Sequence, residues 1–209
     1  MSQHRILIGL ALAGSLIVGS IALAQQAKQA PAKAPAKGAA PSASAAPAGP
    51  VLAFTFVRGL GARKENLGVI EIEMYPADAP KSVEHVVNLV KNKFYAGLRV
   101  HWATPSLLQF GDPNSKDMTK KDMWGTGGSG KPVGVAEAGL AKHKFDRGIV
   151  GLAYRQEYDA KTADSQMFII KGSNSAANGR YAVLGKVTTG LAIIDKLEVG
   201  DRIESAVVK

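Results

Sequence analysis

One segment of the chain, residues 98–113 with the sequence LRVHWATPSLLQFGDP, holds the side chains best suited to bind a ligand. Pro105 interrupts it, because proline fixes φ and donates no backbone hydrogen bond. The chain then resumes with Leu107 and Leu108 and places Gln109, whose amide both donates and accepts hydrogen bonds. Two apolar segments folded back around a polar amide predict a groove for a partly apolar, uncharged ligand.

The part of this segment before the proline is predicted to be a β-strand. Successive side chains of a strand point to opposite faces of a sheet. Leu98, Val100 and Trp102 are therefore expected to share one face. Arg99 and His101 are expected to take the other face.

Other chemistries find little support in the sequence. The chain has no cysteine, which excludes disulfides and thiol chemistry. None of its four histidines has the spacing to another histidine or to a carboxylate pair that a metal site needs. Residues 125–131 fit the pattern G-x-x-x-x-G-K, but Pro132 stands where a phosphate-binding loop needs Ser or Thr. We therefore expect no metal and no nucleotide, and we interpret residues 124–134 as a flexible surface loop.

The charge distribution argues against a nucleic-acid partner. The formal net charge is +9, yet all 17 acidic residues and all but four of the 26 Lys and Arg lie within residues 51–209. No cluster of Lys and Arg falls on one predicted element. A basic balance with acidic residues scattered through it is not typical of a nucleic-acid-binding surface.

The N-terminal region has the pattern of a secretory signal peptide. Residues 6–23 are apolar or small without a charge, and Ala22-Leu23-Ala24 is a small-x-small site followed by polar Gln25. We predict a signal peptide at residues 1–24 and a protein exported to the periplasm or cell envelope, with no membrane span after cleavage. The alternative is an uncleaved anchor, because the apolar run is near the roughly 18 residues that indicate a transmembrane helix.

The next segment, residues 25–50, consists mostly of Ala, Pro, Lys and Ser. Without large apolar side chains it gains too little from burial to offset its ordering entropy, so we predict a disordered Ala/Pro-rich linker. The folded domain is then expected at residues 51–209, and we expect it to be a monomer.

Apolar patterning predicts short strands and two helices in this domain. The helices are expected at residues 81–95 and 190–197. The strands, besides the one described above, are expected at residues 51–57, 68–74, 147–153, 165–171, 181–187 and 203–208. Many short strands with two separate helices indicate a mainly β fold, a closed antiparallel barrel with helical plugs.

This succession of segments resembles the cyclophilin family of peptidyl-prolyl cis-trans isomerases. The matching pieces stand in the family's order over roughly residues 68–196 and read GVIEIEMYPADAPKSVEHVVNLV, FYAGLRVH, QFGDP, WGTGGSG, HKFDRGIVGLA, DSQMFII and NGRYAVLGKVTTGLAIIDKL. The resemblance implies a closed eight-stranded antiparallel β-barrel capped by two α-helices.

The resemblance also implies an activity, catalysed rotation about X-Pro peptide bonds, which assists protein folding. The uncatalysed rotation is slow because amide resonance sets a barrier of about 18–20 kcal/mol. No cofactor and no metal are implied. The expected partners are proline-containing peptide segments of exported or envelope proteins.

Four side chains receive catalytic roles from the resemblance. Gln109 falls on the family's groove glutamine. Gln166 and Phe168 fall on its Q-x-F pair, as a polar contact and as a floor for the proline pocket. Tyr181 falls on a pocket position that is His or Tyr in the family.

Further residues are expected to bind the substrate. Ala153 falls on the alanine whose backbone holds the peptide, and Tyr154 follows where the family often has Asn. Ala177 stands where the family usually has a large apolar residue, which predicts a wider and less apolar pocket. The segment before the groove glutamine is one residue short. Leu107 either takes the apolar site two positions before that glutamine, which we prefer, or stands in for the pocket phenylalanine.

Trp102, also expected at the substrate, takes the position of the family's main catalytic arginine. An indole has one N–H donor and no charge, so it does not replace a guanidinium fork. Arg99 is expected to face away from Trp102, and Arg155, which follows Tyr154, is an alternative donor. The sequence leaves two main functions open: an isomerase with weakened activity, or a catalytically silent cyclophilin-like module that binds peptides. A purely structural envelope spacer is a third hypothesis, which rests on the linker and an uncleaved signal alone.

Overall fold

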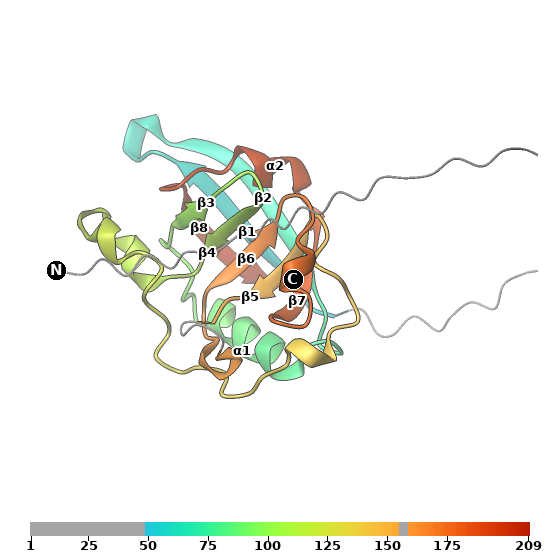
Figure 1. The fold of residues 1–209 in the computed structure, drawn as a ribbon. Coiled ribbons are helices and arrows are strands. Elements are labelled where there is room, and N and C mark those ends of the chain that lie inside the picture. Colours follow the sequence, from blue (N-terminus) through green and yellow to red (C-terminus); the bar gives the residue numbers. More distant parts are fainter. Residues whose placement is uncertain (1–48, 155–158) are drawn as a thin grey trace, which may run out of the picture. The chain divides into compact units, whose positions relative to one another are not determined.

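The structure is a computed structural model that describes residues 49–154 and 159–209 (Figure 1). The predicted signal peptide, nearly all of the predicted linker and Arg155 lie outside these residues, so those expectations stay predictions. The last predicted linker residue already belongs to the domain, because Pro50 O accepts a hydrogen bond from Met74 N at 2.9 Å.

Eight antiparallel strands form a single sheet that curls into a nearly closed barrel, as predicted. Their order is β3-β4-β6-β5-β7-β2-β1-β8, and the two edge strands meet. At this seam Gly97 N donates to Ile203 O at 2.8 Å, and Ile203 N donates to Leu98 O at 2.8 Å. The strands are β1 (Val51–Arg58), β2 (Glu65–Met74), β3 (Val100–Ala103), β4 (Leu107–Phe110), β5 (Ile149–Leu152), β6 (Met167–Ile170), β7 (Ala182–Thr189) and β8 (Arg202–Val208).

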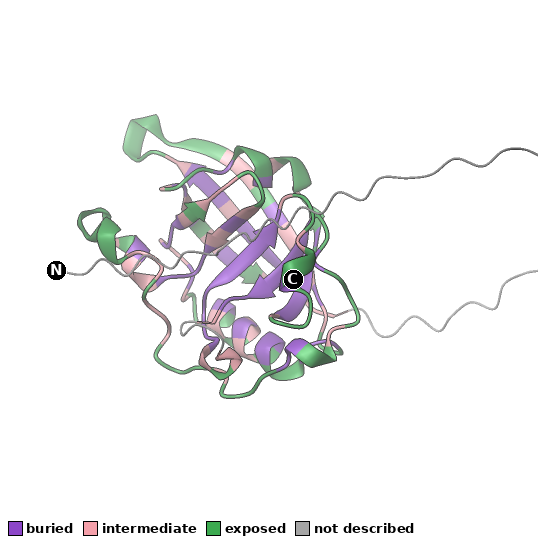
Figure 2. Ribbon diagram, in the orientation of Figure 1, coloured by how far each residue is buried: buried purple, intermediate pink, exposed green. Residues whose placement is uncertain are grey.

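Strand alternation fills the interior of the barrel. In β2, Ile70 and Ile72 are fully buried while Val69 is exposed, as the sequence pattern predicts. Phe54 of β1 packs edge-on against Tyr95, with ring centroids 5.6 Å apart. Figure 2 shows buried residues running along the strands, with exposed residues in the surrounding loops. Each such large apolar side chain contributes about 1.5–3 kcal/mol through burial.

Two helices cover the barrel, α1 (Pro80–Lys91) and α2 (Leu191–Lys196), and they lie at different ends of the strands in Figure 1. The first turn of α1 lacks a capping side chain of its own, because its preceding residue is an alanine. Glu137, from a distant loop, replaces the cap and accepts from Lys81 N and Ser82 N, both at 2.8 Å. In the described part of the chain, no helix has the length and apolar character needed to cross a membrane.

The first helix ends before the predicted residue 95. Lys93 adopts a positive φ of 57°, which ends the helical path. Phe94 N turns back to Leu89 O at 3.0 Å. The apolar stripe of α1 nevertheless faces the core, since Val83 and Val86 are buried.

The predicted alternation fails in β3. Val100 pairs with Phe110 of β4. Trp102, two residues later, pairs with Gln109, which is only one residue earlier. His101 is the additional residue of this β-bulge, and it turns Trp102 to the opposite face from Val100. Val100 is fully buried and Trp102 is 40% exposed, so the prediction that they share a face is wrong.

Candidate functional site

A row of directly opposed residues crosses five strands on the outer side of the barrel. Directly opposed residues of antiparallel strands point to the same face of a sheet. We call this set the groove row. Its members, in order from β3 to β7, are Trp102, Gln109, Phe168, Gly151 and Val183.

The floor of the groove row is the ring of Phe168, which lies over Gly151. A Cβ atom on Gly151 would lie 2.3 Å from Phe168 Cζ and 2.7 Å from Phe145 Cε1, so only glycine leaves room for this ring. Phe145 stacks on Phe168 with centroids 5.4 Å apart. Tyr181 meets the ring of Phe168 edge-on at 5.1 Å. The result is an aromatic surface whose position is fixed by packing from two sides.

Tyr154 adds a further ring to this surface. It stacks on Tyr181 with centroids 4.5 Å apart and an interplanar angle of 8°. Ala153, the residue before it, is anchored to the neighbouring strand, since Ala153 N donates to Gln166 O at 2.8 Å. The structure therefore brings the predicted residues of this edge together beside Phe168.

The two predicted glutamines form a hydrogen-bonded pair. Gln109 Nε2 donates to Gln166 Oε1 at 2.9 Å. Gln166 is buried, and its Nε2 donates to Gly125 O at 2.9 Å and to Gly127 O at 2.8 Å. The interpretation of residues 124–134 as a flexible surface loop is therefore incomplete, because two carbonyl groups of this segment accept hydrogen bonds from Gln166.

Leu107 and Ala177 belong to the apolar surroundings of Phe168 rather than to the glutamine pair. Leu107 is half-buried and packs against the cluster that holds Phe168. Ala177 belongs to the same cluster and is only 3% exposed. The strand β4 pairs with β6 without a register shift, and Leu107 lies opposite Ile170. Whether Leu107 and Ala177 touch a substrate stays a prediction.

Trp102 places a neutral N–H donor in the groove row, at the position where the cyclophilin family has an arginine. Its side chain is 40% exposed, and its Nε1–H has no hydrogen-bond partner among the described residues. Arg99 is buried and turned elsewhere, since its Nη1 donates to Ser115 O at 3.0 Å and to Lys116 O at 2.8 Å. The expectation that Arg99 does not serve this site agrees with these contacts.

Sequence reasoning missed His101 as an unusual group. Both of its ring nitrogens are buried, and neither has a hydrogen-bond partner among residues 49–154 and 159–209. Burial lowers the pKa of His101 to about 4, and the nearby Asp112 and Gln166 oppose this shift only in part. The imidazole is therefore neutral at physiological pH.

It also missed Gly151 and Phe145, which shape the floor. Gly151 did carry a signal, because a glycine inside an apolar strand often marks the close approach of another group. Phe145 carried no such signal, because it lies outside the strands and contacts Phe168 only once the chain has folded.

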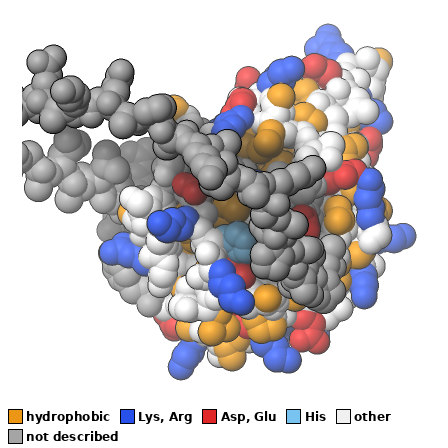
Figure 3. Space-filling view, turned by 90° about the vertical axis from the view of Figure 1, so that its right-hand side faces the viewer, with side chains coloured by type: hydrophobic (Ala, Val, Ile, Leu, Met, Phe, Trp, Pro, Cys, Tyr) orange, Lys and Arg blue, Asp and Glu red, His pale blue; other side chains and the backbone are white. Residues whose placement is uncertain are grey.

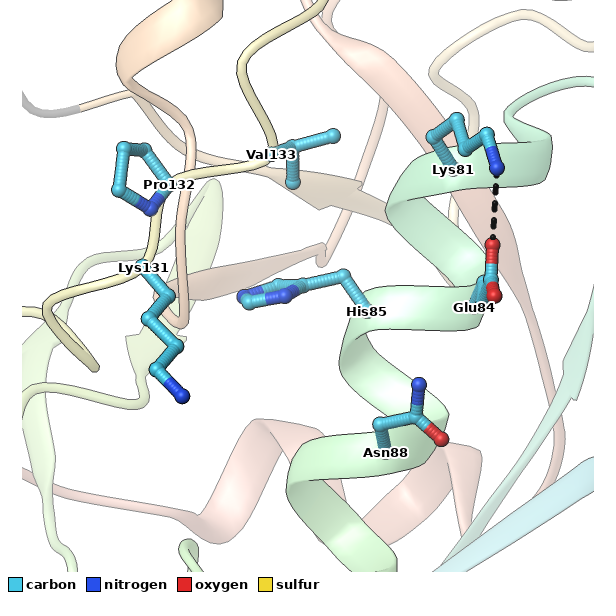
Figure 4. Close-up of a pocket in the computed structure, with 7 residues that line it drawn as sticks. All are labelled: Lys81, Glu84, His85, Asn88, Lys131, Pro132 and Val133. Carbon is cyan, nitrogen blue, oxygen red and sulfur yellow. Dashed lines mark hydrogen bonds and ion pairs between the residues drawn. The ribbon is translucent and has the colours of Figure 1, made fainter.

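The hollow drawn in Figure 4 is separate from the groove row. It has a volume of about 240 Å³ and lies between α1 and residues 131–133. Figure 4 shows the His85 ring pointing from α1 toward this loop, while Lys81 pairs with Glu84 at 3.2 Å. His85 also contacts the buried Asp164. Burial alone would raise the pKa of Asp164, but hydrogen bonds with His85 and Ser129 hold this pKa below its ordinary value.

The surface carries no strong concentration of one charge on the face in Figure 3. Lys and Arg side chains alternate there with Asp and Glu side chains, and hydrophobic side chains lie between them. Within residues 49–154 and 159–209, no three His, Asp or Glu side chains gather as a metal site would need.

Comparison with known proteins identifies this arrangement. The family described as cyclophilin type peptidyl-prolyl cis-trans isomerase/CLD matches residues 62–209. A probable peptidyl-prolyl cis-trans isomerase of Brucella suis is 36% identical over 146 residues, which cover 68% of this chain and 72% of that protein. The peptidyl-prolyl cis-trans isomerase of Helicobacter pylori is 33% identical over 147 residues, with 69% and 83% covered. The chain belongs to the cyclophilin-type peptidyl-prolyl cis-trans isomerase family.

The fold of a solved cyclophilin agrees with this assignment. A crystal structure of a cyclophilin-type isomerase from Cryptosporidium parvum matches with a TM-score of 0.61 and 21% identity, covering 77% of this chain and 98% of that one. A second structure of the same protein, in the presence of the dipeptide Ala-Pro, matches with the same TM-score and 22% identity. By homology this cyclophilin is a peptidyl-prolyl cis-trans isomerase, as its sequence predicts.

The groove row of this cyclophilin suits a prolyl ligand. An aromatic floor favours the apolar pyrrolidine ring, and an amide pair at its side can bind peptide groups without introducing charge. None of the five residues of the row carries a charge.

We predict that Gly151→Ala weakens binding of a proline-containing tetrapeptide about tenfold or more. The added methyl group displaces Phe168 toward the groove, and overpacking also lowers stability by about 1–3 kcal/mol. Peptide affinity is measured by NMR titration and stability by urea unfolding. Gly172→Ala is the matched control, because a Cβ there has no heavy atom within 4 Å. Equal peptide affinity in the two variants would contradict the role of Gly151.

We predict that His101 makes the domain less stable in acid. Its pKa is about 4 in the folded protein and 6.5 in the reference state, so unfolding takes up a proton between these values. The contribution is fully present above pH 6.5 and is lost as the pH falls toward 4, by up to about 3 kcal/mol. Urea unfolding across this range measures it. His101→Leu should flatten the pH dependence, and an unchanged slope would refute the assignment.

Proposed function

We propose that this cyclophilin isomerises X-Pro bonds of exported proteins and so assists their folding, at a rate lowered by Trp102. The observation that carries the proposal is the groove row, in which an aromatic floor lies beside an amide pair. The proline ring rests on Phe168 with Tyr181 at its edge. Gln109 binds the peptide backbone next to the ring.

Rotation about the X-Pro bond requires the loss of amide resonance. A groove that holds the ring and the adjoining backbone separately lowers the entropy cost of reaching the twisted bond. The twisted amide has less charge separation than the planar one, so an apolar floor favours it over the ground state. Neither step needs a nucleophile on the protein.

The residue at position 102 determines how strongly a hydrogen bond stabilises the twisted transition state. Trp102 offers one neutral N–H where the family arginine offers a charged fork. Hydrogen bonds from a charged donor are about twice as strong as those from a neutral donor. Replacing a charged donor by a neutral one therefore loses about 1–1.5 kcal/mol at the transition state, which lowers kcat/KM roughly 5- to 12-fold.

We predict that the full chain accelerates isomerisation of a proline-containing tetrapeptide above the uncatalysed rate in a protease-coupled assay. Trp102→Arg should raise kcat/KM about five- to tenfold by restoring a charged donor. Phe168→Ala should lower kcat/KM by at least tenfold because it removes the floor. A Trp102→Arg rate equal to that of the wild type would contradict the proposed cause of the weakened activity.

A second candidate function is peptide binding without turnover. It is favoured by Trp102 in the arginine position and by the stack of Tyr154 on Tyr181, which suits holding of an extended segment. The same assay separates the two functions. A wild-type rate at the uncatalysed background, with peptide binding intact and activity gained in Trp102→Arg, supports the binding module.

We further propose that the chain acts after export, on clients in the periplasm or cell envelope. The support is the charge-free run at residues 6–23 and the small-x-small site ending at Ala24. We predict that N-terminal sequencing of the protein recovered from the cell envelope begins at Gln25. An intact Met1 would contradict cleavage, and recovery only from the cytoplasm would contradict export.

A further inference from the structure

A buried carboxylate holds one part of the loop that faces the glutamine pair. Asp112 is fully buried, and its Oδ1 accepts from Asn114 N at 2.8 Å. Its other oxygen, Oδ2, accepts from Gly125 N. A Cβ on Gly127 would lie 2.3 Å from Asp112 Oδ1, so the chain passes directly over this carboxylate. Asp112 therefore fixes the path of residues 125–127.

This path leaves two carbonyl groups aimed at one amide. Gly125 O and Gly127 O both accept from Gln166 Nε2, at 2.9 and 2.8 Å. A carbonyl oxygen only accepts hydrogen bonds, so a reversed amide would place Gln166 Oε1 against two other oxygens. Because Gln166 is 4% exposed, water does not relieve such a conflict. The loop thus selects one orientation of the Gln166 amide.

The orientation of Gln166 selects that of Gln109 in turn. With both Nε2 hydrogens used by the loop, Gln166 presents only Oε1 to its neighbour. Gln109 must meet that oxygen with its own Nε2, as the 2.9 Å contact shows. Gln109 Oε1 then stays free on the groove row, since no described residue donates to it.

We propose that Asp112 is a positioning residue that acts through residues 125–127 and Gln166 to keep the amide oxygen of Gln109 facing the bound peptide. Gln109 Oε1 then accepts an N–H from a peptide residue next to the proline, which has no N–H of its own. The peptide contact rests on the proposed function. The orientation of the two amides does not.

The test compares two aspartates that cap consecutive short helical turns. Asp112 precedes the turn Pro113–Lys116, and Asp117 precedes the turn Met118–Met123. Asp117 Oδ1 accepts from Thr119 N at 2.9 Å. Of the two carboxylates, the hydrogen bonds of Asp112 alone include one from Gly125 N. Asp112→Asn and Asp117→Asn both alter a cap, so a difference between them reports on the loop.

The readout is hydrogen exchange of the Gln166 side-chain amide in the full-length protein, followed by NMR. In the wild type we expect both Nε2 hydrogens to exchange at least tenfold more slowly than those of an exposed glutamine. Asp112→Asn should accelerate this exchange at least tenfold, and Asp117→Asn should leave it unchanged. Unchanged exchange in Asp112→Asn, or equal acceleration in Asp117→Asn, would overturn the proposal. If Asp112→Asn does not fold, Gly127→Ala displaces the same loop and takes its place.

Peptide turnover measured on the same samples keeps this proposal apart from the proposed function. Asp112→Asn should also lower kcat/KM about tenfold, while Asp117→Asn should match the wild type. If Asp112→Asn accelerates the exchange but the wild type has no isomerase activity, the amide orientation is supported and the proposed function is contradicted. A normal kcat/KM in Asp112→Asn despite accelerated exchange contradicts the positioning role.

Discussion

The site depends on the alternation of side chains along β6 and the residue before it. Met167 and Ile169 enter the barrel interior, while Phe168 and Ile170 join the apolar cluster on its outer side. The strand is therefore held by burial on both faces, which fixes its register strongly. Gln166 shares the outer side with Phe168, so the hydrophobic core itself determines where the polar group and the aromatic floor stand. A one-residue slip would turn Gln166 and Phe168 toward the barrel interior and Met167 and Ile169 toward the groove.

The polar part of the groove is built from dipoles rather than charges. Gln166 receives its orientation from two backbone carbonyls, and the fully buried Asp112 is the only ionisable group in that chain of contacts. The Asp112 carboxylate accepts hydrogen bonds from backbone N–H groups, and these hydrogen bonds compensate the cost of its burial. The groove surface stays neutral as a result. That arrangement matches a substrate whose transition state is less polar than its ground state.

Most of the fold follows from patterns that the sequence contains. Alternation places Ile70 and Ile72 correctly, because burial on one side of a strand gives a period of two. It fails at Trp102, because a bulge adds a residue to one strand and leaves no local mark in the sequence. The sequence also does not predict the contacts of the loop at Gly125. Its partners Asp112 and Gln166 are distant in sequence, and their hydrogen bonds exist only in the folded chain. Resemblance to a family supplied the site residues that patterning alone did not.

The bulge explains how the groove can change its chemistry without changing its fold. The bulge residue, His101, turns the next side chain outward, and this depends on backbone pairing rather than on what that side chain is. Any residue at position 102 therefore faces the groove beside Gln109. The bulge is unfavourable for His101, because its two buried ring nitrogens have no hydrogen-bond partner in the described part of the chain. An arginine at this position would enter the same row with its guanidinium in solvent, and the present tryptophan enters it with an indole. The backbone that turns residue 102 toward the groove is thus independent of the side chain it carries, and that single residue decides which group the groove row presents beside Gln109.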